Sequence, residues 1–168
     1  MQRNFKIAVM FVILATVFCL NAQNYERRTV LTKMILAQLD RLHFSPEKID
    51  DDLSEKAFDL YLKRIDYAKR YLTKEDVTEL EKFRYEIDDE LKFNTNELYE
   101  TANKLLNEKI EFIQGFYADF LTQPFDYSIS DTLELDYDKI DFCENEAELK
   151  ERWRKLLKYQ TIVRYIDI

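Results

Sequence analysis

The chain has 168 residues, of which 46% are hydrophobic and 35% charged, a composition that predicts a packed domain and excludes an intrinsically disordered chain. Acidic residues outnumber basic ones by 33 to 25, and the net charge of −8 argues against nucleic acid and anionic lipid as partners. Glycine occurs once and proline twice, which excludes glycine-rich phosphate loops and favours helices joined by polar loops.

Residues 1–22 have the three-part layout of a secretory signal peptide. Two basic residues precede an uninterrupted apolar run over residues 7–20, and the small residue Ala22 follows. The run is shorter than the ~20 apolar residues that a membrane-spanning helix needs. We therefore expect cleavage after Ala22, no stable membrane span afterwards, and one domain over residues 23–168. Cys143 then remains without a second cysteine for an intramolecular disulfide; a buried, inert thiol is expected, and intermolecular pairing is a minor alternative.

Apolar residues at helical spacing predict an all-α fold, an irregular bundle of about five helices. The expected helices cover residues 25–42, 53–66, 73–93, 96–121 and 145–168. Residues 125–142 lose this periodicity, and we expect them to form one extended connector between the last two helices. The connector is rich in Asp, Tyr and β-branched residues, so a short edge strand within residues 132–136 is an open alternative.

Capping residues predict where these helices start. Two pairs have the spacing of a capping box, Thr73 with Asp76 and Asn145 with Glu148. Asp52 or Ser54 is expected to cap the helix over residues 53–66. The single glycine, Gly115, falls inside the predicted fourth helix, where it costs about 1 kcal/mol relative to alanine.

Few side chains offer bond-making chemistry. The single histidine, His43, is expected at a helix end, where it interacts with the helix dipole, so no Ser-His-Asp triad is predicted. Ser45 with Lys48 matches the S-x-x-K pattern, and Ser54 with Lys56 offers a second pair. The S-D-N and K-T-G elements that accompany the S-x-x-K nucleophile are absent from the sequence. We predict no catalytic residue, no metal site and no cofactor.

The C-terminal helix carries more aromatic and apolar side chains than packing against one neighbouring helix requires. Apolar surface of this kind usually marks a site for a macromolecular partner. The residues predicted to contact a partner are Trp153, Leu157, Tyr159, Val163, Tyr165 and Ile166.

Three blocks of the sequence resemble one known family. They are "FSPEKIDDDLSEKAFDLYLKRIDYAKRYLTKEDVTELEKFRYEIDDEL" at 44–91, "QPFDY" at 123–127 and "NEAELKERWRKLLKYQT" at 145–161. Together they closely resemble the N-terminal helical domain of bacterial tail-specific proteases, also called carboxy-terminal processing peptidases, in the form found in Bacteroidota. The resemblance covers residues 25–165.

The resemblance implies a periplasmic protein whose helical domain precedes a PDZ domain, a protease core with a Ser/Lys dyad and a C-terminal helical domain. In that family the helical domain shapes the access of protein substrates and can dock a TPR-type lipoprotein adaptor. No Ser/Lys dyad can be assigned to this chain, because the sequence ends where the PDZ domain is expected to begin. We therefore expect a non-catalytic module that contacts the PDZ and protease domains.

Two hypotheses from different classes follow. The chain is either a truncated or split piece of a tail-specific protease, or an independent secreted helical protein that binds and regulates the full-length enzyme. A hydrolase that uses Ser45 or Ser54 is the least favoured reading, since neither serine has the accompanying motifs.

Overall fold

The computed structural model describes residues 29–38 and 48–166, and the chain forms two compact units. Among the described residues, the first unit comprises residues 29–38, 48 and 91–94, and the second comprises residues 49–90 and 95–166. The predicted signal peptide over residues 1–22 lies outside the described residues, as do His43 and Ser45.

The first unit is described over one helix and a short segment. Residues 29–38 are helical, which confirms this part of the predicted helix over residues 25–42. The side-chain amide of Asn94 donates a hydrogen bond to the hydroxyl of Thr29. Asn94 has a φ of 57°, in the left-handed region that asparagine tolerates better than most residues.

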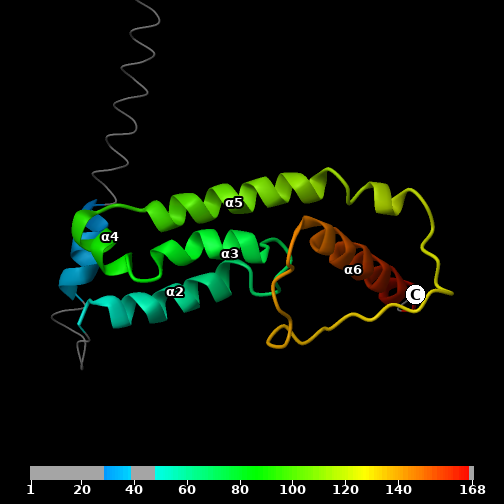
Figure 1. Ribbon diagram of the computed structural model, residues 1–168, viewed down its shortest axis with the longest axis horizontal. Helices are drawn as coiled ribbons and strands as arrows, with labels where there is room; N and C mark the ends of the chain where they lie inside the picture. Colours follow the sequence, from blue (N-terminus) through cyan, green and yellow to red (C-terminus); the bar gives the residue numbers. More distant parts are fainter. Residues whose placement is uncertain (1–28, 39–47, 167–168) are drawn as a thin grey trace, which may run out of the picture. The chain divides into compact units, whose positions relative to one another are not determined.

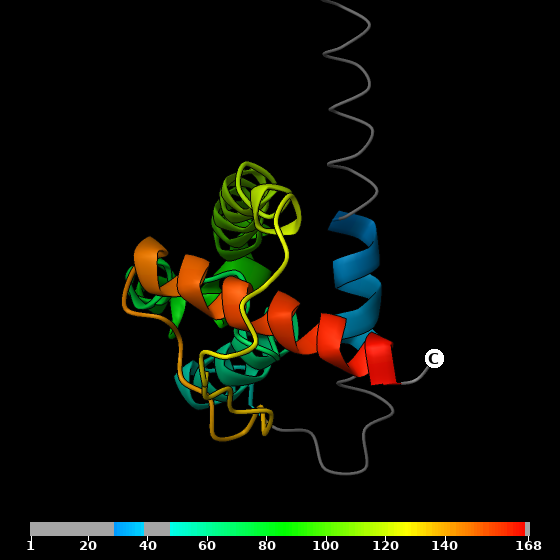
Figure 2. The same cartoon turned by 90° about the vertical axis from the view of Figure 1, so that its right-hand side faces the viewer.

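The second unit contains most of the helical structure. Its helices are α2 (Asp51–Ile65), α3 (Lys74–Leu80), the start of α4 (Ile87–Phe93), α5 (Glu97–Gln114) and α6 (Glu146–Ile166), with short 3₁₀ helices at Glu81–Phe83 and Asp119–Leu121. No strand occurs among the described residues, so the predicted all-α fold is confirmed. Within this unit α2, α3 and α5 run side by side, and α6 lies across their ends (Figures 1 and 2).

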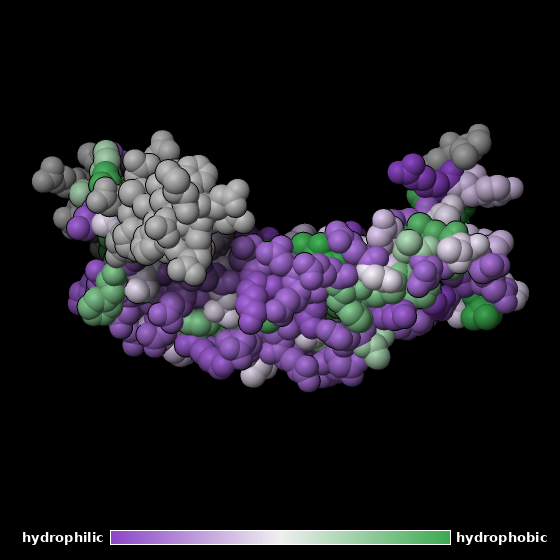
Figure 3. All heavy atoms as spheres, turned by 90° about the horizontal axis from the view of Figure 1, so that it is seen from above, coloured by the Kyte–Doolittle hydropathy of each residue, from purple (hydrophilic) through white to green (hydrophobic). Residues whose placement is uncertain are grey.

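The core of the second unit lies where α2, α3 and α5 face one another. Its buried members are Phe58, Leu72, Leu80, Leu98 and Ala102. Partly buried apolar side chains from these helices, and also Phe83, Ile87 and Phe142 from outside them, pack around this cluster. The surface is mostly hydrophilic with separate hydrophobic patches when viewed from the α5 side (Figure 3). No helix in the described part of the chain is both long and apolar enough to cross a bilayer.

The helix starts agree with the predicted caps at α3 and differ at α2. Thr73 and Asp76 form a complete capping box at α3. At α2 the cap is Asp50, whose carboxylate accepts the N–H of Leu53, so the prediction of Asp52 or Ser54 was wrong. Ser54 is instead 1% exposed and faces the core.

The predicted helix over residues 73–93 is broken into α3, a 3₁₀ turn and α4. The reason is a tertiary cap from α2. The hydroxyl of Ser54 accepts the N–H of Asp88 at 2.9 Å and donates to the Asp88 carboxylate at 3.0 Å. It therefore satisfies a backbone donor in the first turn of α4, which an unbroken helix would not need.

The predicted helix over residues 96–121 ends earlier than expected, because α5 stops at Gln114 and Gly115 is its C-cap. The apolar stripe continues past this point through edge-to-face contacts of Phe112 with Phe116 and of Phe116 with Phe120. Apolar residues thus continue at a spacing of four after the α-helical backbone has ended. This is why the apolar periodicity predicted a helix longer than the one observed.

The connector over residues 125–142 has no regular secondary structure, as predicted, and residues 132–136 form no strand. Its end is tied to α3 by a single parallel bridge between Thr73 and Cys143, in which Lys74 donates its N–H to the Cys143 carbonyl at 2.8 Å. Cys143 is fully buried, and burial raises the pKa of its thiol to about 11, so the thiol is an inert part of the core.

Candidate docking surface on α6

The loop between α2 and α3 provides the platform on which α6 rests. Its organising group is the buried carboxylate of Asp66, which accepts the backbone N–H groups of Arg70, Tyr71 and Leu72, each at 2.9 Å. Lys69 takes a left-handed φ of 48° within this turn. Three bonds to one carboxylate fix the loop, including the carbonyl groups on its α6 side.

The first half of α6 binds this loop through two side-chain donors. Arg152 donates from Nη1 to the carbonyl of Lys69, and Trp153 donates from Nε1 to the carbonyl of Arg70, both at 2.7 Å. The Trp153 ring also meets Tyr71 edge to face at 6.1 Å between centroids. Leu149 and Leu156 are buried on the same half of the helix. This half of α6 is therefore held in a defined position.

The N-terminus of α6 is capped and paired. Asn145 accepts the N–H of Glu148 at 3.1 Å, as predicted, while the Glu148 carboxylate reaches back to the N–H of Glu144 rather than to that of Asn145. Lys109 of α5 lies 2.8 Å from Glu146 and 3.5 Å from Asp76. Burial alone would lower the pKa of Lys109, but the two carboxylates outweigh it and raise that pKa above its usual value.

The connector is bound to the middle of α6 by Asp131. Its carboxylate lies 2.6 Å from Arg154 and 2.7 Å from Lys158, and the buried Lys158 ammonium also donates to the carbonyl of Ile129 at 2.8 Å. The hydrogen bonds from Arg154 and Lys158 hold the pKa of Asp131 at about 2. The connector is therefore attached to α6 mainly by charge.

The last two turns of α6, after Lys158, differ from the first half of the helix in their exposure to solvent. Every residue from Tyr159 to Ile166 is exposed. Four of the apolar ones recur at i, i+3, i+4 and i+7, which places them on one side of the helix. They are Tyr159, Ile162, Val163 and Ile166, with exposed fractions of 39%, 37%, 36% and 74%. We call these four side chains the α6 docking face.

The structure separates the six residues predicted to contact a partner into three groups. Tyr159, Val163 and Ile166 belong to the α6 docking face. Trp153 and Leu157 are four residues apart on another stripe and are partly buried, and the Trp153 N–H is used inside the fold. Tyr165 is 83% exposed and lies at the edge of this face, since it is three positions from Ile162 but two from Val163. Sequence reasoning missed Ile162, which the i+3 spacing from Tyr159 would have identified.

The serine candidates for catalysis do not gather with a lysine in the described part of the chain. The Ser54 hydroxyl is buried and bonded to Asp88 as both donor and acceptor. Lys56 is exposed two positions away on α2, and residues two apart on a helix do not face each other. Ser45 lies outside the described residues.

Comparison with known proteins places the chain in a family. The tail specific protease N-terminal domain family matches residues 35–167, and the chain belongs to this family. The match includes the whole of α2 to α6 and the connector, and therefore the elements that carry the α6 docking face.

One curated relative is the tail-specific protease of Haemophilus influenzae. It is 26% identical to this chain over 142 residues, which are 82% of this chain and 20% of the relative. The chain thus spans about a fifth of the length of the relative that it matches.

Proposed function

We propose that the chain acts as the non-catalytic N-terminal helical module of an exported tail-specific protease, and that its α6 docking face packs against the PDZ and protease domains of that enzyme. The observation that carries the proposal is the contrast within α6, whose first half is anchored while its last turns expose Tyr159, Ile162, Val163 and Ile166. An anchored helix that ends in an exposed apolar face presents that face in a fixed orientation.

Burial of this face would stabilise a complex appreciably. Burial of apolar surface contributes about 25 cal/mol to the free energy of binding for each Å² removed from water. The conformational entropy lost on binding is small for side chains on a helix that is already ordered. The four side chains leave a third or more of their surface exposed in this chain. A neighbouring domain that covers them therefore gains affinity at little entropic cost.

We also propose the finer roles that the family resemblance implies. The module shapes the access of protein substrates to the enzyme and docks a partner such as a TPR-type lipoprotein adaptor. It acts in the periplasm after export by the signal peptide over residues 1–22. The layout of that segment, two basic residues, an apolar run and a small residue, supports this location.

The alternative function is an independent secreted helical protein that binds and regulates the full-length protease. The closed polar network of the second unit favours this alternative, since no buried side-chain nitrogen or oxygen in the described residues lacks a hydrogen-bond partner. In both cases the chain acts by contact with another protein.

The first prediction tests the α6 docking face. The chain is titrated by isothermal calorimetry with a separately produced PDZ and protease portion of a tail-specific protease. Ile162→Ser combined with Ile166→Ser should weaken binding by tenfold or more. Burial of each isoleucine contributes about 1.5 kcal/mol or more, and serine loses most of this free energy. Thr161→Ala is the matched control, since Thr161 is exposed on the same turns but is only one or two positions from Tyr159, Ile162 and Val163 and so faces another side.

The outcomes separate the hypotheses. Equal binding by the wild type and the double variant would contradict the proposed role of the α6 docking face. Binding to the intact full-length enzyme, but not to the enzyme that lacks its own helical domain, would favour the independent regulator.

A further inference from the structure

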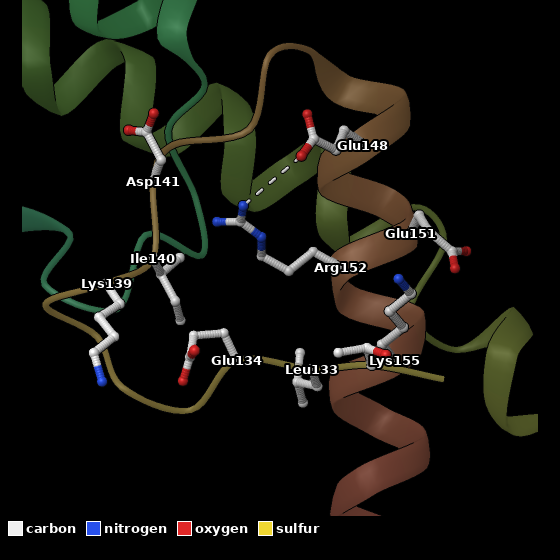
Figure 4. Close-up of a pocket in the computed structure, with 10 residues that line it drawn as sticks. Leu133, Glu134, Lys139, Ile140, Asp141, Glu148, Glu151, Arg152 and Lys155 are labelled. Atoms are coloured by element: carbon white, nitrogen blue, oxygen red, sulfur yellow. Dashed lines mark ion pairs between the residues drawn. The ribbon is translucent and has the colours of Figure 1, made fainter. Parts of the chain in front are cut away.

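A cavity of about 330 Å³ lies between the connector and the exposed flank of α6 (Figure 4). Thr132, Leu133 and Glu134 form part of the connector wall, and Arg152 and Lys155 form part of the α6 wall. This volume is near the lower limit of ligand pockets in proteins, so the cavity fits a short segment rather than a folded element.

The connector wall exposes an unpaired backbone edge. Neither the N–H nor the C=O groups of Thr132, Leu133 and Glu134 form a hydrogen bond within the described part of the chain. Asp131 and Leu133 are half-buried while Thr132 and Glu134 are exposed, which is the two-residue alternation of an extended chain. Unpaired donors and acceptors along an extended segment are the template for addition of a strand.

One end of this segment is fixed before any ligand arrives. Asp131, which precedes Thr132, is bound to Arg154 and Lys158 of α6. Further along the connector, the Lys69 ammonium donates to the carbonyl of Ile140, and Lys74 lies 3.1 Å from Asp141. A ligand that pairs with residues 132–134 therefore meets a segment whose start is already held in place, which favours binding.

One charged side chain on the cavity wall, that of Lys155, forms no ion pair within the described residues. Glu134 accepts the N–H groups of Leu135 and Asp136, and Glu151 is paired with Arg154. By contrast, no hydrogen bond or ion pair is formed by the ammonium of Lys155 among residues 29–38 and 48–166. Its charge acts only at a distance on Glu151, whose pKa is lowered mainly by Arg154 and further by Lys155. A carboxylate in the cavity would thus meet a cation that has no direct partner.

We propose that this cavity binds an extended polypeptide segment, which adds as a strand to the backbone of residues 132–134 and places an acidic side chain against Lys155. Strand addition of this kind takes its affinity from backbone hydrogen bonds and its selectivity from side chains in adjacent pockets. The proposal rests on the connector and not on the α6 docking face, so the two are tested by different variants.

The second prediction uses a defined probe, a fluorescein-labelled peptide of sequence Thr-Val-Glu-Val-Thr with an amidated C-terminus. Binding to the purified chain is measured by fluorescence anisotropy. Lys155→Met should raise Kd about fivefold, as should replacement of the peptide Glu by Gln, because both remove the same ion pair. Lys104→Met is the matched control, since Lys104 is an exposed lysine of α5 outside the cavity.

Backbone pairing is tested separately from charge. A peptide with N-methyl groups on alternate amides should lose measurable binding, and the unmodified peptide should slow hydrogen exchange at the amides of Thr132, Leu133 or Glu134. The proposal is overturned if the N-methylated peptide binds as well as the parent, if Lys155→Met leaves Kd unchanged, or if these amides show no added protection. Each of these results leaves the test of the α6 docking face intact.

Discussion

At the scale of single residues, Asp66 has the largest influence on the fold around α6. Its carboxylate is 4% exposed and accepts three consecutive backbone N–H groups that have no helical or sheet partner. Removal of the carboxylate leaves these donors unsatisfied in a largely dehydrated loop, and each buried donor without a partner costs about 1–3 kcal/mol. The same loop supplies the carbonyls that bind Arg152 and Trp153.

The third prediction concerns this carboxylate. Asp66→Ala should lower the free energy of unfolding by about 3 kcal/mol, measured by urea denaturation followed by circular dichroism. Asp59→Ala is the control, because Asp59 is 61% exposed in a surface ion pair with Arg84, and such pairs contribute about 0–1 kcal/mol. A loss at Asp66 no larger than the loss at Asp59 would show that the loop does not depend on the carboxylate.

At the scale of elements, the connector over residues 125–142 is attached to the helices mainly by polar groups. Asp131 contacts Arg154 and Lys158 of α6, and near its other end Asp138 lies 3.0 Å from Lys63 of α2. The ring of Tyr137 meets Tyr67 edge to face, and the hydroxyl of Tyr137 accepts a hydrogen bond from Arg70. Attachment by charge makes the position of the connector sensitive to pH, and the partly exposed pairs are also screened by salt.

The fourth prediction follows from the pKa of Asp131. The hydrogen bonds from Arg154 and Lys158 lower this pKa from 3.8 to about 2 in the folded chain. A depressed carboxyl pKa contributes stability above the unfolded value, and the contribution is lost as the pH falls from about 4 to about 2. Acid denaturation monitored by circular dichroism should therefore show a weaker pH dependence in this range for Asp131→Asn.

The control for this prediction is Asp119→Asn, because the side chain of Asp119 forms no ion pair within the described residues. The prediction fails if Asp131→Asn and the wild type lose stability in parallel between pH 4 and pH 2.

At the scale of the whole molecule, exposed apolar surface and negative charge oppose each other. The net charge of −8 keeps molecules apart, while the α6 docking face offers four exposed apolar side chains to any complementary surface. Charge repulsion between molecules is screened by salt, whereas burial of apolar surface is not. Self-association of the isolated chain should therefore increase with ionic strength.

The fifth prediction is the size of the isolated chain in solution. Light scattering should detect association that grows between low salt and about 0.5 M sodium chloride. The pair Ile162→Ser and Ile166→Ser should reduce it, and Thr161→Ala should not. A strictly monomeric chain at every salt concentration would indicate that the α6 docking face is covered within the molecule itself.

Local pattern was sufficient for much of the fold. The helical class, the capping box of Thr73 with Asp76, the lack of regular structure over residues 125–142 and the buried Cys143 are all predictable, because helix caps and apolar periodicity act within a few residues of the chain. The helical run past Gly115 was overestimated for the same reason, since aromatic contacts keep the spacing of a helix after the backbone has left it.

Sequence alone thus determined the family, the all-α class and the exposed apolar end of α6, because these depend on residue type and short-range spacing. Only the tertiary structure decided that Ser54 caps α4, that Asp66 orders the loop beneath α6 and that the Trp153 N–H donates to the Arg70 carbonyl. Each of these contacts joins a side chain to a backbone group on another element or in an irregular loop. Such groups carry no sequence signal, because every residue has the same backbone donor and acceptor and only the fold determines which of them are left to be satisfied.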